Sequence, residues 1–204
     1  MSDLIMKKLK EIEGEFKFFH QLLESSGISP SEEYKRINLT YFRMYCTHYE
    51  SFCILLQNAH FSSGMLIVRS MLEIFVKSHY LEFIAKGKGD SVNYYLEGKI
   101  KYPSFFKMTE ELDDFMKKND EGSGGHFSQY TKNELASYEK FSYFSHGHGE
   151  FVKCFYEHGE IGYSTEQISD VIETTRGMFK ALSMLLCGVQ EKHNELALVI
   201  KRFG

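Results

Sequence analysis

Two short stretches of the sequence bring together residue types that could carry out acid–base or phosphate chemistry. The first, FSYFSHGHG at residues 141–149, places two imidazoles beside glycines. An imidazole titrates near neutral pH and can therefore exchange a proton with a substrate. His146 is followed by Gly147, which would leave space for that substrate, and is preceded one helical turn earlier by Ser142, which could orient the ring. The other interpretation is a helix C-terminus, with Gly147 as its cap and a charged His146 favourable in the last turn.

The second stretch places a charged pair inside an apolar helical pattern. In MLIVRSMLEIFVKSHYLEF, residues 65–83, Arg69 has apolar neighbours on its own helical face, and Glu73 follows one turn later. The carboxylate can then bond the guanidinium along the helix, so we expect a mostly buried ion pair. Because burying ions is costly, two interpretations stay open. The pair either ties this helix to a neighbour, or it presents the guanidinium to a phosphate or another chain.

A weaker signal is the Arg-x4-His pattern that Arg43 and His48 form in RMYCTH. Five residues turn a helix through about 500°, so these side chains would point roughly 140° apart unless the helix is distorted. Such a pattern also arises by chance in a helical protein with 9 histidines. Arg43 and His48 are therefore secondary candidates.

A metal site is a further possibility in the region that begins at His146. Residues of types that bind zinc stand there at four positions, namely His146, His148, Cys154 and His158. Their spacings, H-x-H, H-x5-C and C-x3-H, match no common zinc motif. The aromatic residues between them are typical of packing positions. The sequence therefore predicts neither a metal nor another cofactor.

Long helices would have to position these residues. Apolar residues recur at steps of three and four, and only 2 prolines accompany 18 phenylalanines and 13 tyrosines, which favours helices around a bulky aromatic core. Ser164 and Gln167 form a capping box at the start of the last long helix. Helices are predicted over residues 4–23, 30–58, 63–85, 91–99, 104–118, 131–146 and 164–189.

The predicted fold is an all-α, up-and-down helical bundle in a single domain, residues 1–204. Its N-terminal helix falls within 1–27, a flexible loop is expected at 119–130 and an irregular loop around 148–163. The first loop contains the glycine-rich sequence NDEGSGGHF, which lacks the Lys-Ser/Thr pair and the preceding strand of a phosphate-binding loop.

Composition limits the classes of function. The formal net charge is −4, which argues against a protein whose main affinity comes from covering nucleic-acid phosphates. No apolar run reaches the roughly 18 residues of a membrane span, and the N-terminus is amphipathic, unlike a signal peptide. The 4 cysteines are scattered, which favours reduced thiols. We therefore expect a cytoplasmic protein without a membrane partner.

The segments RSMLEIFVKSHYL and YEKFSYFSHGHG together resemble a group of poorly characterised bacterial HEPN-like helical proteins. Members of the group tend to show an Arg-x3-Glu pair in an apolar helix and a Ser-x3-His-Gly sequence that ends a later helix. Arg69 and Glu73 match the first pattern, and residues 142–147 match the second. The resemblance follows the order of helices over about residues 40–190.

The resemblance implies a protein that acts on RNA as a homodimer. The wider superfamily includes metal-independent endoribonucleases, often toxins of toxin–antitoxin systems or antiviral and antiphage effectors. In such an enzyme a 2′-hydroxyl attacks the adjacent phosphate, and His146 would be the general base or acid. Arg69, held by Glu73, would stabilise the phosphate charge, while Ser142 would orient the imidazole and His148 would be a reserve acid.

Two other functions stay open. The first is a non-catalytic module of the same fold that binds a nucleotide or a protein partner from the same operon, as a sensor or an antitoxin does. The second is a purely structural bundle whose polar residues only fix the register of the helices. An enzyme of this kind should be toxic on overexpression, whereas a nucleotide sensor should be harmless and gain thermal stability from its ligand.

Overall fold

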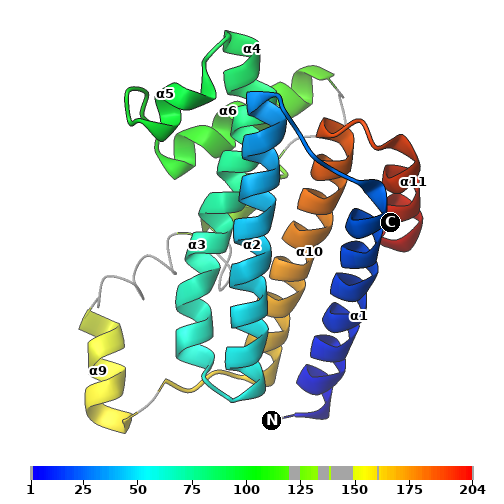
Figure 1. Cartoon of the computed structure of the whole chain (residues 1–204). Coiled ribbons are helices and arrows are strands. Elements are labelled where there is room, and N and C mark those ends of the chain that lie inside the picture. The colour runs from blue at the N-terminus through cyan, green and yellow to red at the C-terminus, as the bar shows by residue number, and fades with distance from the viewer. Residues whose placement is uncertain (1, 120–124, 133–137, 139–148, 160, 204) are drawn as a thin grey trace.

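The fold is known from a computed structural model that describes residues 2–119, 125–132, 138, 149–159 and 161–203. Within these residues every regular element is a helix and no strand occurs, so the all-α prediction is confirmed. Long helices lie alongside one another and form the body of the molecule (Figure 1). They are α1 (Asp3–Ser26), α2 (Glu33–Gln57), α3 (Phe61–Tyr80) and α10 (Thr165–Val189).

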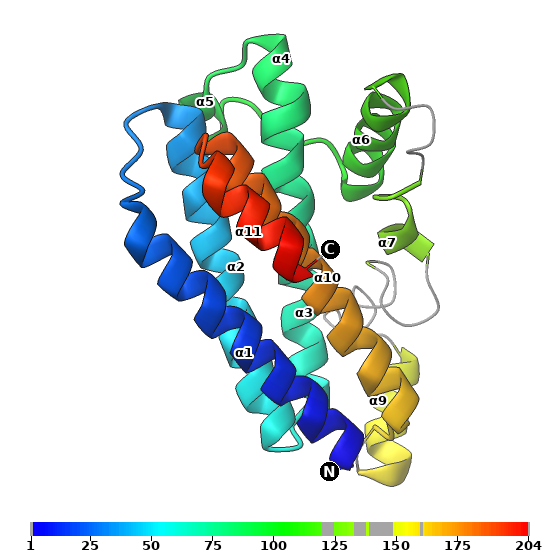
Figure 2. The same cartoon turned by 90° about the vertical axis from the view of Figure 1, so that its right-hand side faces the viewer.

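The first three long helices alternate in direction, whereas α10 runs the same way as α3 (Figures 1 and 2). Parallel neighbours need a long connection, and here it extends from residue 81 to residue 164. The C-terminal helix α11 (His193–Phe203) then packs against α1 and α10. The described helices of the connection are η1, a π-helix (Leu81–Ala85), α4 (Lys86–Lys88), α5 (Val92–Leu96), α6 (Phe105–Asn119), α7 (Gln129–Lys132) and α9 (Gly149–His158).

The irregular loop predicted around 148–163 is wrong for most of its length, because residues 149–158 form α9. The prediction took the glycines of this region as signs of irregular backbone. They stand instead at the two ends of the helix: Gly149 is its first residue, and Gly159 follows its last with a φ of 73°. The nine residues between them contain neither glycine nor proline. A short helix therefore fits between the two breakers.

The loop predicted at 119–130 contains ordered structure in its described part. The carboxylate of Asp113 on α6 accepts hydrogen bonds from the backbone N–H groups of Phe127 and Ser128, both at 2.9 Å. The Ser128 hydroxyl also donates to this carboxylate. A buried carboxylate thus satisfies two N–H groups just before α7 and ties that helix to α6.

Aromatic side chains fill the centre of the bundle, as the composition predicts. Phe179 of α10 lies 5.9 Å from Phe19 of α1 and 5.5 Å from Tyr49 of α2, measured between ring centroids. The Tyr45 hydroxyl donates a 2.6 Å hydrogen bond to the backbone oxygen of Thr175. The predicted capping box of Ser164 and Gln167 is also present and starts α10.

Candidate functional site

Three charged side chains follow one another at four-residue steps on α3 and so lie on one face of the helix. The Oε1 atom of Glu73 is 3.7 Å from Nε of Arg69, and its Oε2 atom accepts a 3.0 Å hydrogen bond from Nζ of Lys77. The predicted pair is therefore formed. Its side chains are 21% and 31% exposed, which places Arg69 and Glu73 at the edge of the core and not deep within it.

Tyr138 completes this cluster from a distant part of the chain. Its hydroxyl donates to Oε1 of Glu73 at 3.2 Å and lies 3.4 Å from Nη2 of Arg69, which donates to it. The guanidinium also lies 5.2 Å from the centroid of the Tyr138 ring, a cation–π distance. The ring itself stacks on Phe105 of α6 at 4.0 Å. Arg69 is thus oriented by a carboxylate, a hydroxyl and an aromatic face.

The predicted residues Ser142, His146 and His148 lie outside the described residues, so their place relative to Arg69 stays a prediction. Cys154 and His158 of the zinc hypothesis both stand on α9. Among the residues that the structure describes, no group of three or more His, Cys, Asp or Glu side chains could hold a metal ion.

Arg43 and His48 do not share a site. Arg43 is exposed on α2 and lines the mouth of a cavity of about 570 Å³ between α1 and α2, which His48 does not line. The floor of this cavity is apolar, with Phe16 and Phe19 from α1 and Phe42 from α2 among its residues.

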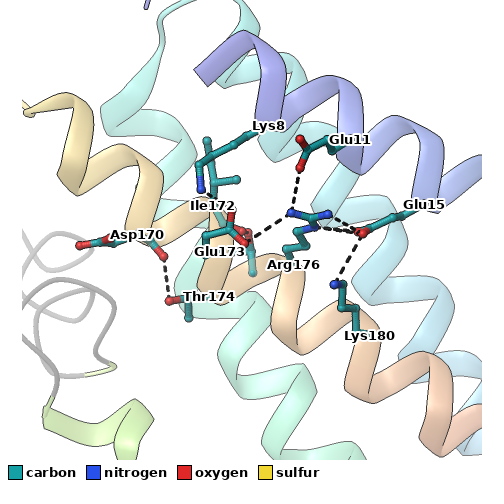
Figure 3. A network of polar contacts seen from close by, with 10 residues as sticks. Lys8, Glu11, Glu15, Asp170, Ile172, Glu173, Thr174, Arg176 and Lys180 are labelled. Carbon is teal, nitrogen blue, oxygen red and sulfur yellow. Dashed lines mark hydrogen bonds and ion pairs between the residues drawn. The ribbon is translucent and has the colours of Figure 1, made fainter. Parts of the chain in front are cut away.

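A second charged cluster, which no pattern in the sequence indicated, joins α1 to α10 (Figure 3). The guanidinium of Arg176 donates to both carboxylate oxygens of Glu15, at distances of 2.6 to 3.1 Å, and to Glu11 at 3.1 Å. Hydrogen bonds with Glu15 raise the pKa of Arg176 above its usual value. Only 8% of the Glu15 side chain is exposed, so this is the most deeply placed carboxylate with an ion pair in the described part of the chain. Its position indicates a structural role.

Arg69→Ala is expected to lower the free energy of unfolding by only about 1 kcal/mol, because a pair this accessible to solvent is screened. The expected loss combines a weak ion pair with a cation–π contact on Tyr138. Urea denaturation measures it, with Arg36→Ala, a change at an exposed arginine of α2, as the control. A loss above about 3 kcal/mol would show instead that the pair behaves as a buried one.

Within the described residues, no helix has both the length and the apolar character needed to cross a membrane. No protein-family model matches the sequence, and neither a curated protein nor a solved structure shows significant similarity to the chain.

Proposed function

We propose that this chain is a HEPN-like protein that acts on RNA, as a metal-independent endoribonuclease effector of a bacterial toxin–antitoxin or antiphage system. The observation that carries the proposal is the contact of Arg69 with Tyr138. Tyr138 precedes His146 by eight residues, which span at most about 28 Å of extended chain. Tyr138 contacts the guanidinium, and it stands shortly before the proposed base in the sequence.

The electrostatics of the α3 face support a phosphate ligand. Of the three charged side chains in this row on α3, Arg69 and Lys77 are cations and Glu73 is a carboxylate, so the row itself carries a net positive charge although the chain carries −4. A local positive field attracts a phosphate independently of the net charge. Because Glu73 and Tyr138 fix the guanidinium before any ligand arrives, it would stabilise a developing phosphorane charge with little reorganisation.

The proposed reaction is cleavage by the neighbouring 2′-hydroxyl. The bond from the 2′-oxygen to phosphorus forms while the bond from phosphorus to the 5′-oxygen breaks, which yields a 2′,3′-cyclic phosphate and a 5′-hydroxyl. His146 would take the proton of the attacking hydroxyl or give one to the leaving oxygen. His148 would be the second group, and a homodimer would place two such sites in one assembly.

A second candidate is a non-catalytic module that binds a nucleotide or a protein partner, as a sensor or an antitoxin. The observation that favours it is the cavity of about 570 Å³ between α1 and α2, which has the size of a small-molecule site and an exposed arginine, Arg43, at its mouth. A sensor of this kind would cleave no RNA, and Arg43→Ala would reduce its stabilisation by a nucleotide.

Cleavage of end-labelled RNA in the presence of EDTA separates the two candidates. We expect the wild-type protein to cleave with a bell-shaped pH dependence, because one group must be deprotonated and another protonated. His146→Ala should abolish cleavage and leave the circular dichroism spectrum unchanged. His193→Ala, a change at an exposed histidine of α11, is the matched control and should cleave as the wild type does. RNA that stays intact with the wild-type protein would refute the enzymatic proposal.

A further inference from the structure

A second cavity lies where α3 and η1 face α6, α7 and α10. Its volume is about 320 Å³, at the lower end of the range for small-ligand sites. The wall is mostly aromatic, and two of the polar lining residues, His126 and Gln129, are exposed. The main lining residues are Phe75, His79, Phe83, Met116, Phe127 and Tyr130.

His79 provides the polar group in the deep wall of this cavity. The side chain is 6% exposed and lies among aromatic rings, with ring centroids 4.4 Å from Phe75 and 5.2 Å from Phe127. Its Nδ1 atom is 2.8 Å from the backbone oxygen of Phe75. A carbonyl oxygen only accepts hydrogen bonds, so Nδ1 must carry the hydrogen and Nε2 of the neutral ring is an acceptor.

This acceptor has no partner among the residues that the structure describes. The bond to Phe75 accounts for one ring nitrogen only. Burial also lowers the pKa of His79 to about 4, so the ring stays neutral at physiological pH and Nε2 keeps its lone pair. Nε2 is not among the fully buried polar atoms that lack a partner, so a ligand in the cavity that supplies an N–H group would replace water at this acceptor.

We propose that this cavity binds the base of an adenine nucleoside or nucleotide, with the exocyclic amine donating to Nε2 of His79. Aromatic walls favour a flat heterocycle, since bases stack on such rings whatever their sequence. Adenine is the natural base that combines an amine with the absence of a carbonyl oxygen, which an apolar wall would leave unpaired. The sugar would lie toward the exposed side of the cavity, at His126 and Gln129.

The inference goes beyond the proposed RNA cleavage, because it requires neither Arg69 nor the segment around His146. The two cationic groups of the α3 face and the imidazole of His79 are on different faces of the same helix: Arg69 and Lys77 are partly exposed, whereas His79 is buried. Arg69→Ala should therefore leave the binding of adenosine unchanged even where it abolishes cleavage.

Isothermal titration of the wild-type protein with adenosine and with purine riboside tests the proposal. Purine riboside is adenosine without its amino group, so its base carries no N–H donor. We expect adenosine to bind about tenfold more tightly, the effect of one additional hydrogen bond. Equal affinities, or no binding of either nucleoside, would overturn the proposal without recourse to any variant.

Two variants test whether His79 accepts the hydrogen bond and whether Phe83 stacks on the base. His79→Phe keeps a ring in the wall and removes the acceptor, so it should bring the two nucleosides to equal affinity. Phe83→Leu keeps the wall apolar and removes a stacking surface, so it should weaken both nucleosides about tenfold and preserve the preference for adenosine. A tenfold preference that survives in His79→Phe would contradict the assignment.

Discussion

Arg176→Ala is expected to lower the free energy of unfolding by about 3 kcal/mol, because it leaves the buried carboxylate of Glu15 with a single cation, Lys180, that does not hydrogen-bond to it. In the native protein the guanidinium gives Glu15 three hydrogen bonds, from Nε to both oxygens and from Nη2 to Oε1. The remaining cation, Nζ of Lys180, is 3.6 Å away (Figure 3). Urea denaturation at neutral pH measures the loss.

Two further variants separate the charge from its geometry. Arg176→Lys keeps the charge and loses the fork that contacts both oxygens, so an intermediate loss is expected. Glu11→Ala removes a partner that is 41% exposed and should cost less than about 1 kcal/mol. If Arg176→Ala cost no more than Glu11→Ala, the cluster would contribute nothing beyond an ordinary surface pair.

Acidification should destabilise the wild-type protein by on the order of 3 kcal/mol more than it destabilises His79→Phe. Burial lowers the pKa of His79 from 6.5 to about 4, so between these values the unfolded chain binds a proton that the folded chain does not. Stability is then fully present above pH 6.5 and is lost as the pH falls toward 4.

The measurement compares free energies of unfolding at pH 7 and pH 4.5 for both proteins. Carboxylates also titrate in this range, but they do so in both proteins, and the difference between the two pH dependences isolates His79. Parallel pH dependences would mean that the imidazole of His79 is hydrated or protonated in the folded state.

Local patterns made much of the fold predictable. The steps of three and four residues predicted the long helices, and the four-residue spacing of Arg69 and Glu73 predicted their contact. The same apolar pattern overstated their burial, because the pattern gives the face of a helix and not how far its neighbours cover that face. Helix α9 was missed because glycines that end a helix were taken as signs of a loop.

Contacts between distant segments could not be predicted in this way. Arg176 and Glu15 are 161 residues apart, and nothing in the sequence around either residue indicates the other. Tyr138 likewise meets Arg69 only through the fold of the connection after α3. The cavity beside His79 also depends on how α6 and α7 pack against α3.

The claim that Arg69 and His146 act on RNA at one site is tested most directly by a double-mutant cycle of single-turnover cleavage rates in EDTA. The cycle compares the wild type, Arg69→Ala, His146→Ala and the double variant, with Arg36→Ala as the control. We predict that each single change lowers the rate by about 10²-fold or more. Because residues that act as a unit are not additive, the double variant should be no slower than the slower single variant. Losses that multiply in the double variant, or an Arg69→Ala rate equal to that of the wild type, would contradict a shared site.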